Sequence, residues 1–249
     1  MIQLIGLTEI PEINEGQNIS EVIVAALARQ EIVLDQTDVL VIAQKIVSKS
    51  EGRLVNLQEI LPSQKAIQLA KKSGHSPQHM EVILREATNV LRCENGVVIT
   101  RTRHGFICAN SGVDSSNVPG GSTVCLLPID PDLSAKKISL GITLSTNVNL
   151  PVIICDTFGR PWRNGAINLA IGSWGINPLR DYRGELDSEG ISLKSTQIAV
   201  VDELACAAEL IMNKLDRVPA VLVRGYINKD RSGCIRESML RKEGEDLFL

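Results

Sequence analysis

Short continuous apolar runs alternate along this chain with segments whose apolar residues recur at helical spacing. Continuous runs are typical of buried strands, and the helical spacing is typical of helices with one buried face. This pattern predicts helices over residues 20–29, 64–73, 77–91 and 203–215, and a further helix that begins after Asp130. It predicts strands over residues 38–43, 97–100, 123–127, 152–155 and 220–223, with further short segments at 166–171 and 196–201.

Capping residues indicate where several of these helices begin or end. Ser20 is the expected N-cap of the first helix, and Gly74 follows the end of the second. The third helix and the helix after Asp130 both show a polar cap followed by proline, which fits the first helical position. Ser76-Pro77 and Asp130-Pro131 are these two starts.

The order of helices and strands predicts the fold class. The elements are interspersed, but they do not form a regular series of strand, helix and parallel strand. We therefore expect an α+β fold, mixed α/β with largely antiparallel sheets. The length of 249 residues suits one module over residues 1–249, and a division into two subdomains stays open.

Composition narrows the class of protein. Aromatic residues make up 3% of the chain and the formal net charge is −3, which argues against a general nucleic-acid-binding protein. The six cysteines are widely spaced without a C-x-x-C pair, which suits a reducing cytoplasm. The first residues lack a basic leader pattern, and no apolar run approaches the length of a membrane span. We expect a cytoplasmic protein with no nucleic-acid or membrane partner.

Two polar, glycine-flanked segments carry the most informative chemistry. Asp114 lies in the first segment, residues 112–117, and Asp156 opens the second, residues 156–165; each is expected in a loop that follows a strand. Carboxylate and hydroxyl oxygens are the ligands that Mg²⁺ and Mn²⁺ prefer when they bridge phosphates. Each aspartate taken alone is also compatible with capping a turn. The two segments together favour a metal site.

Basic residues accompany these carboxylates. Arg160 and Arg163 lie in the second segment and are candidates for gripping an anionic substrate. Lys45 and Lys49 follow the predicted strand 38–43 and would share one face of a helix, where they could neutralise nucleotide phosphates. A solvated charged face is the alternative for the lysines. The chain contains no Walker A, G-x-G-x-x-G, G-x-S-x-G or H-E-x-x-H motif.

These segments, in this order, resemble the coenzyme F420-0:L-glutamate ligase family, the γ-glutamyl ligases of deazaflavin biosynthesis, in their single-module form. The resemblance extends from Leu4 to Phe248. It implies an intertwined homodimer and a ligase that uses GTP to join L-glutamate to coenzyme F420-0 through an amide bond. It also implies an acyl-phosphate intermediate and γ-linked extension of the glutamate tail. The matching segments are residues 43–53, 100–117, 126–132, 156–165, 198–212 and 221–225.

The resemblance also implies roles for individual residues. Asp114 and Asp156 would bind one divalent ion, Mg²⁺ or Mn²⁺, and Thr157 a second; a need for K⁺ stays open. Lys49, Asp114 and Asp156 would be the catalytic residues, with Arg160 and Arg163 as candidates for the acceptor. A further nucleotide-contacting stretch falls near residues 213–220. The implied GTP contacts are Leu7, Thr8, Glu9, Ile10, Gln44, Lys49 and Asn117.

The chain departs from the family pattern on one side of the expected site. The family usually places a polar pair, often Gln-Thr, where this chain has Ala166 and Ile167, and small residues where it has Ser173 and Trp174. These departures put the acceptor or the tail length in doubt. Two alternatives stay open: a paralogous GTP-dependent amino-acid ligase that acts on a different carboxylate acceptor, and a non-catalytic nucleotide-binding protein.

Overall fold

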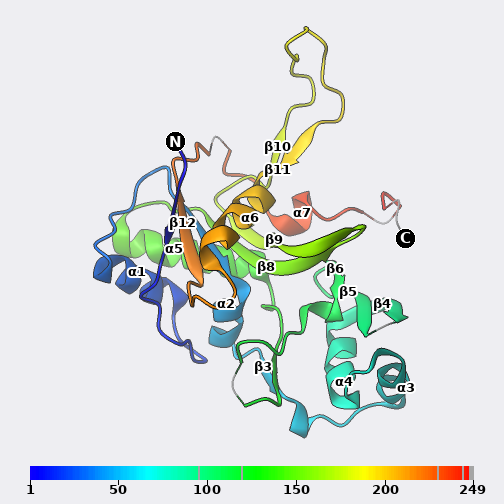
Figure 1. The fold of residues 1–249 in the computed structure, drawn as a ribbon. Coiled ribbons are helices and arrows are strands. Elements are labelled where there is room, and N and C mark those ends of the chain that lie inside the picture. The colour runs from blue at the N-terminus through cyan, green and yellow to red at the C-terminus, as the bar shows by residue number, and fades with distance from the viewer. Residues whose placement is uncertain (95, 119, 229, 243, 247–249) are drawn as a thin grey trace.

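The computed structural model describes residues 1–94, 96–118, 120–228, 230–242 and 244–246 (Figure 1). Leu247 and Phe248, at the end of the segment that resembles the ligases, lie outside these residues. The helices are α1 (Ile19–Arg29), α2 (Gln44–Ser50), α3 (Gln64–Ser73), α4 (Pro77–Glu86), α5 (Pro131–Thr146), α6 (Val200–Met212) and α7 (Ile235–Ser238), with 3-10 turns η1 (Leu57–Glu59) and η2 (Asn110–Gly112). The strands are β1 (Gln3–Gly6), β2 (Val39–Ala43), β3 (Leu54–Asn56), β4 (Ala87–Glu94), β5 (Val97–Thr102), β6 (Ile107–Ala109), β7 (Thr123–Cys125), β8 (Val152–Arg160), β9 (Arg163–Trp174), β10 (Leu179–Asp181), β11 (Gln197–Ala199) and β12 (Ala220–Arg224).

A five-stranded sheet in the order β1-β12-β2-β8-β9 forms the centre of the molecule. Strands β2 and β12 in its interior are almost entirely apolar, which is typical of strands that are buried on both faces. Helix α6 lies across one face and α5 covers the other, with α1 packed against α5 (Figure 1). Among the described strands, β2 and β8 are the one parallel pair, and the other pairs are antiparallel. The α+β prediction with largely antiparallel sheets is confirmed.

A smaller lobe is built from the middle of the chain. The antiparallel sheet β4-β5-β6 packs with α3 and α4 around a second hydrophobic cluster that includes Met80, Ile83 and Val98. The short pair β3-β7 lies between this lobe and the central sheet (Figure 1). Phe106 on the lobe side contacts Phe158 of β8 edge to face, with 6.2 Å between the ring centroids. The lobe therefore packs directly against the outer part of β8.

The helix predicted over residues 77–91 is only partly correct. Ser76 caps α4 as expected, but the helix ends at Glu86 and residues 87–91 belong to β4. β4 pairs with β5 along its length, with register shifts after Ala87 and Val90. This pairing prevails over the helical spacing because cross-strand contacts outweigh the small differences in local propensity.

The prediction that Asp156 lies in a loop is wrong. β8 continues through Asp156 to Arg160 and pairs with β9, so residues 152–174 form one long β-hairpin. Only Pro161 and Trp162 lie between the two strands. Pairing with β9 extends β8 through polar residues that carry no strand signal of their own. The predicted strand therefore ended too early, at the last residue of the apolar run.

Local signals predicted other helix ends with mixed success. Gly74 ends α3 in the left-handed conformation, with φ of 75°, and Asp130 caps α5, both as expected. The N-cap of α1 is Asn18 and not Ser20, because the Asn18 carboxamide accepts the Ser20 backbone N–H. Helix α6 runs from Val200 to Met212, three residues earlier than predicted at each end. No helix in the described part of the chain has both the length and the apolar character to cross a membrane.

Candidate active site

A cleft of about 610 Å³ opens at the edge of the central sheet where β2 and β8 end. Its size falls within the usual range for small-molecule sites. In the parallel register Ala43 lies beside Cys155, so the residues that follow each strand emerge at the same edge. The charged and polar side chains that line the cleft are Glu12, Gln44, Lys45, Lys49, Asp114, Asn117, Asp156, Thr157, Asn168, Glu209, Asn213, Lys214 and Arg217.

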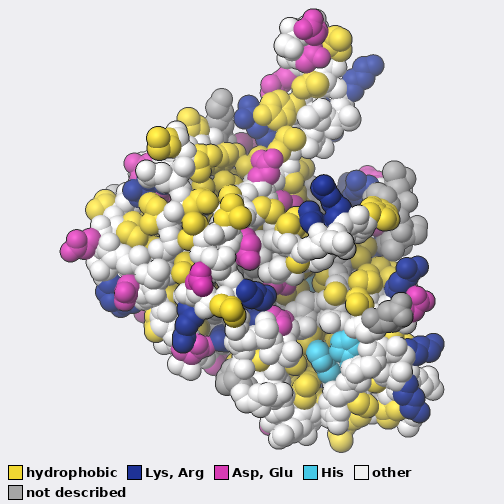
Figure 2. All heavy atoms as spheres, viewed as in Figure 1, with side chains coloured by type: hydrophobic (Ala, Val, Ile, Leu, Met, Phe, Trp, Pro, Cys, Tyr) yellow, Lys and Arg dark blue, Asp and Glu magenta, His cyan; other side chains and the backbone are white. Residues whose placement is uncertain are grey.

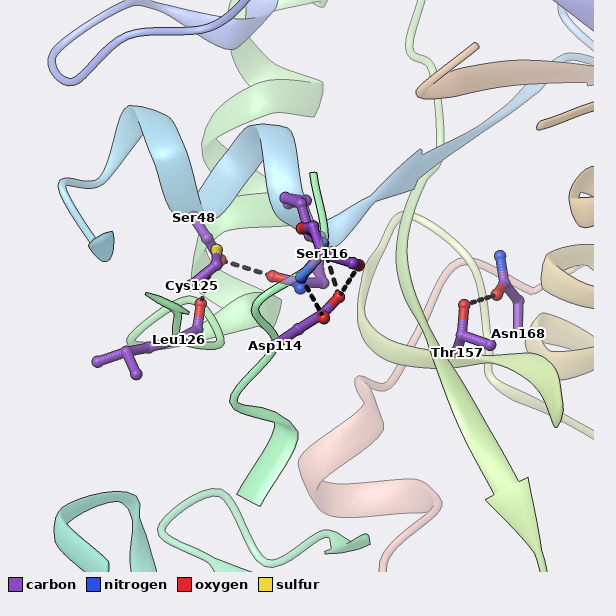
Figure 3. Close-up of polar contacts among 9 residues, drawn as sticks. Ser48, Asp114, Ser116, Cys125, Leu126, Thr157 and Asn168 are labelled. Atoms are coloured by element: carbon purple, nitrogen blue, oxygen red, sulfur yellow. Dashed lines mark hydrogen bonds and ion pairs between the residues drawn. The ribbon is translucent and has the colours of Figure 1, made fainter. Parts of the chain in front are cut away.

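Asp114 reaches the cleft from the lobe. Its backbone pairs with Cys125 in an isolated antiparallel bridge, which fixes the loop. Its Oδ1 accepts the Ser116 backbone N–H at 2.8 Å, and its Oδ2 accepts the Ser116 hydroxyl at 2.7 Å (Figure 3). Lys45 Nζ lies 2.6 Å from Oδ2. Burial acts to raise the pKa of Asp114, but the hydrogen bonds from Lys45 and Ser116 outweigh it and hold the pKa below its usual value.

Asp156 lies in a less polar environment on β8. Burial raises the pKa of Asp156 to about 6, and the negative charge of Asp114 acts in the same direction. The charges of Lys45 and Lys214 oppose this shift only in part. A carboxylate whose charge is poorly compensated by the protein favours a bound cation, because the cation restores the balance that burial removed.

Thr157 and Asn168 form a polar pair on the other side of β8. The Thr157 hydroxyl donates to Asn168 Oδ1 at 2.8 Å, so the lone pairs of the hydroxyl oxygen stay available for another ligand (Figure 3). Asn168 is buried, and its amide nitrogen faces the sulfur atoms of Cys155 and Met212. Asn168 therefore fixes the direction of the Thr157 hydroxyl.

Helix α2 supplies another part of the cleft wall. Gln44 is 2% exposed; its Oε1 accepts the Ser48 hydroxyl, while its amide nitrogen has no hydrogen-bond partner among the described residues. A buried donor of this kind is costly unless a ligand uses it. Lys49, one turn further, is buried and forms an ion pair with Glu12, which also lies 3.5 Å from Arg217.

Thiols beside the two carboxylates are not nucleophiles. Cys125 pairs with Asp114 through the backbone, and Cys155 precedes Asp156 in β8. Burial raises the pKa of Cys125 to about 11 and raises that of Cys155 further. Because the thiolate is the reactive form, these cysteines stay inert at neutral pH.

Residues 8–225 match the model of the F420-0:Gamma-glutamyl ligase family. The chain belongs to this family. A protein of Methanothermobacter thermautotrophicus named Coenzyme F420:L-glutamate ligase is 45% identical over 226 residues, which cover 90% of this chain and 89% of that protein. Proteins with the same name from Methanocaldococcus jannaschii and Methanopyrus kandleri are 41% and 43% identical, covering 99% and 90% of this chain and 96% and 90% of those proteins.

The cleft brings together most of the residues that the ligase resemblance selects. Lys49, Asp114 and Asp156 line it, as do Thr157, Gln44, Asn117 and Ile10. Leu7, Thr8 and Glu9 do not line it: Leu7 is fully buried, and the backbone N–H groups of Thr8 and Glu9 donate to Gln30 Oε1. Arg160 and Arg163 lie at the tip of the β8-β9 hairpin, where the Arg160 guanidinium donates to the Asn164 carbonyl at 2.7 Å.

Sequence reasoning missed several side chains of the cleft. Glu12, Asn168 and Glu209 carry no local motif, and their place depends on contacts between distant segments. Lys214 and Arg217 lie in the loop after α6, inside the stretch that the resemblance marked near residues 213–220. Arg217 reaches Glu12 from 205 positions away along the chain, and no spacing rule could have paired them.

The donor atoms in the cleft fit Mg²⁺ or Mn²⁺. Asp114, Asp156 and Thr157 offer carboxylate and hydroxyl oxygens, which these hard ions prefer. The described residues contain no cluster of three or more His, Cys, Asp or Glu side chains of the kind that holds a metal by itself.

Proposed function

We propose that the protein is a GTP-dependent ligase that joins L-glutamate to coenzyme F420-0 through an amide bond. The names of its relatives support the two substrates. One observation supports the chemistry above all: Asp114, Asp156, Lys45 and Lys49 open on the same cleft from three separate segments. This is the charge arrangement that phosphoryl transfer requires, with carboxylates for a divalent ion and ammonium groups for phosphate oxygens.

The first step of the proposed reaction activates the acceptor. A carboxylate oxygen of F420-0 attacks the γ-phosphorus of GTP; the new bond is an acyl phosphate, and the β–γ bridging oxygen leaves with GDP. The protein's task in this step is positioning and charge neutralisation. Lys49 would contact phosphate oxygens after exchanging its partner Glu12 for the nucleotide. Gln44 would donate its unpartnered amide N–H to the nucleotide.

The second step forms the amide. The amine nitrogen of L-glutamate attacks the acyl carbon, phosphate leaves with the bonding electrons, and the nitrogen loses its proton. Repetition on the new γ-carboxylate would extend the tail through γ-linked glutamates. Within the cleft, Asn168 is hydrogen-bonded to Thr157 and also contacts Met212 of α6, the helix that carries Glu209. We assign the nucleotide to the α2 side and the amine to the α6 side.

The divalent ion belongs to this proposal through Asp114, Asp156 and Thr157. When bound, Mg²⁺ or Mn²⁺ would supply charge that stabilises the phosphates during transfer. The protein's own contribution is to hold these oxygens in place. Ser116 fixes Asp114, and Asn168 fixes Thr157. A need for K⁺ remains an expectation from the resemblance.

Arg160 and Arg163 stay candidates for the anionic acceptor. Both lie on the hairpin that also carries Asp156, so an acceptor bound along β8 would have its reactive carboxylate near the cleft. Arg160 is partly committed to the hairpin turn through its contacts with the Asn164 and Gly165 carbonyl groups. Arg163 is exposed and is the stronger of the two candidates.

The proposal includes a homodimer in the cytoplasm. The arm formed by β10, β11 and the residues between them stands clear of the body and carries exposed apolar side chains (Figure 2). Leu186 and Ile191 on the arm are 67% and 64% exposed, which suits a partner subunit. All six cysteines are free, and a reducing compartment would keep them so. Light scattering of the purified protein would report the dimer directly.

The test of the proposed function is a complete reaction with each component left out in turn. Purified protein, GTP, Mg²⁺ or Mn²⁺, F420-0 and L-glutamate should together release GDP, and mass spectrometry should show one or more glutamyl units added to F420-0. Asp114→Asn and Asp156→Asn should each lower turnover by more than about a hundredfold, in line with the loss of one preorganised electrostatic contact. Asp187→Asn, on the exposed arm, is the matched control and should keep wild-type turnover.

Two outcomes would contradict parts of the proposal. Bound GTP without any mass gain on F420-0 would indicate a different carboxylate acceptor. Near-normal turnover of either aspartate variant at saturating Mn²⁺ would show that this aspartate only caps the local backbone.

A further inference from the structure

The ammonium group of Lys45 is surrounded by oxygen atoms of the Asp114 loop. Lys45 Nζ lies 2.6 Å from Asp114 Oδ2, 2.5 Å from the Ser116 carbonyl oxygen and 3.1 Å from the Ser116 hydroxyl. Its side chain is only 16% exposed. An ammonium group has three hydrogens to donate, so these contacts use all of them. Carboxylate, carbonyl and hydroxyl oxygens are also the donor set of a hard metal cation.

The carboxylate of Asp114 has little capacity left beside Lys45. Oδ2 accepts both Lys45 and the Ser116 hydroxyl, and Oδ1 accepts the Ser116 backbone N–H. A carboxylate oxygen offers about two lone-pair sites, so Oδ2 is fully used. A divalent ion that binds Oδ2 must therefore replace Lys45, because two cations on one oxygen would repel each other.

The Lys45 ammonium group could bind another anionic group inside the cleft. It is the second residue of α2, it lines the same cleft as Lys49, and its four-carbon stem can swing without moving the helix. Nucleotide phosphates placed against Lys49 would lie within the reach of both lysines, which are four residues apart on one helical face. Phosphate oxygens would then satisfy the ammonium group that the metal ion displaces.

We propose that Lys45 is a displaceable counter-ion of Asp114, which leaves the carboxylate when nucleotide and divalent ion bind and then pairs with the phosphates. This inference rests on the proposed function for the identity of the nucleotide. It makes the two ligands mutually dependent, since the nucleotide draws Lys45 away and thereby frees Asp114 for the ion. By thermodynamic linkage each ligand must raise the affinity for the other by the same factor.

The direct test measures Mn²⁺ affinity by calorimetry, with and without GTP, in wild type and in Lys45→Met. No acceptor or glutamate is present, so no turnover complicates the titration. Lys45→Met should bind Mn²⁺ alone roughly five- to a hundredfold more tightly than wild type, the usual range of coupling between two sites. GTP should raise Mn²⁺ affinity in wild type, and this enhancement should be largely lost in Lys45→Met.

Two further variants separate this role from simple charge removal or damage to the fold. Lys49→Met also removes one positive charge from the cleft, but Lys49 pairs with Glu12 and not with Asp114. It should weaken GTP binding and leave the affinity for Mn²⁺ alone unchanged. Lys45→Arg keeps the charge beside Asp114 and should keep the weak binding of Mn²⁺ alone. Thermal unfolding of each variant checks that the fold is retained.

The outcomes are distinguishable from a failure of the proposed function. Folded Lys45→Met that binds Mn²⁺ alone no more tightly than wild type would overturn the inference, whatever GTP does. Equal gains in Mn²⁺ affinity from Lys45→Met and Lys49→Met would also overturn it, because the effect would then be general electrostatics. Wild type that binds Mn²⁺ but no GTP would refute the nucleotide of the proposed function, while the comparison with Mn²⁺ alone would still decide the role of Lys45.

Discussion

Asp156→Asn should stabilise the protein while it abolishes turnover, and the gain in stability should depend on pH. The ordinary carboxyl pKa of 3.8 rises to about 6 in the folded chain because the half-buried group is desolvated and lies near the charge of Asp114. A raised native pKa means that the folded state holds the proton more tightly than the unfolded state does. Below about pH 4 Asp156 is largely protonated in both states and does not change the free energy of unfolding. Above about pH 6 the native state carries a poorly compensated charge, which lowers the free energy of unfolding.

The size of the effect follows from the shift. The difference is about two pKa units, and each unit corresponds to about 1.4 kcal/mol. Ionised Asp156 therefore lowers the free energy of unfolding by at most about 3 kcal/mol at pH 8. Asparagine has the same shape, carries no charge, and can still accept a hydrogen bond from the Thr157 backbone. For a chain of this length, 3 kcal/mol corresponds to a Tm increase of roughly 6 to 12 °C.

The assay is thermal unfolding of wild type and Asp156→Asn at pH 5 and pH 8, with EDTA present to remove divalent ions. The variant should unfold at a higher temperature at pH 8, and about half of this gain should disappear at pH 5. Asp187→Asn, which removes an exposed carboxylate on the arm, should change Tm little at either pH. An Asp156→Asn variant that is less stable than wild type at pH 8, or whose gain is the same at both pH values, would refute the reasoning.

Three further predictions concern the scaffold and the acceptor side. Arg224→Met leaves the fully buried Asp38 without its ion-pair partner and should lower the free energy of unfolding by about 3–5 kcal/mol in denaturant titrations; changing Asp38 to Asn as well should recover much of it. Gly172→Ala places a Cβ 2.3 Å from the backbone of α5 and should cause a large fall in Tm, whereas Gly159→Ala, with nothing within 4 Å, should be tolerated. Replacing the Ala-Ile pair at 166–167 by Gln-Thr should change the KM for the acceptor or the tail length while GTP affinity stays constant, and unchanged steady-state kinetics and product mass would remove this pair from the acceptor site.

Elements with strong local signals could be predicted from the sequence. The apolar run of β2 and the glycine after α3 each determine structure within a few residues, so both were predicted closely. β4 and the outer half of β8 could not be found in this way, because pairing with β5 and β9 decides their conformation. The local sequence pattern predicts an element reliably only where the tertiary contacts of that segment favour the same conformation.

In the candidate site, the residues with suitable chemistry could be predicted from the sequence, but their interaction partners could not. Lys45, Lys49, Asp114 and Asp156 could be selected because their residue types and neighbours suit phosphate and metal chemistry. Which charge meets which could not be inferred: Lys45 pairs with Asp114 across 69 positions, and Lys49 pairs with Glu12, which no motif marked. The charge around each carboxylate and each lysine depends on these ion pairs, so it can be determined only from the folded structure.

The parallel pair β2-β8 explains why activating groups and acceptor-side groups can act on one substrate. Parallel strands end at the same edge of a sheet, which places the start of α2 beside Asp156 without any insertion. β8 then continues outward as the first strand of the β8-β9 hairpin, so Asp156 and Arg160 lie on the same strand. The lobe packs against this strand at Phe158. The lobe also delivers Asp114, and a shift of the lobe would therefore move one carboxylate relative to the other. For that reason the contact between Phe106 and Phe158 should matter for catalysis as well as for packing, although neither ring lines the cleft.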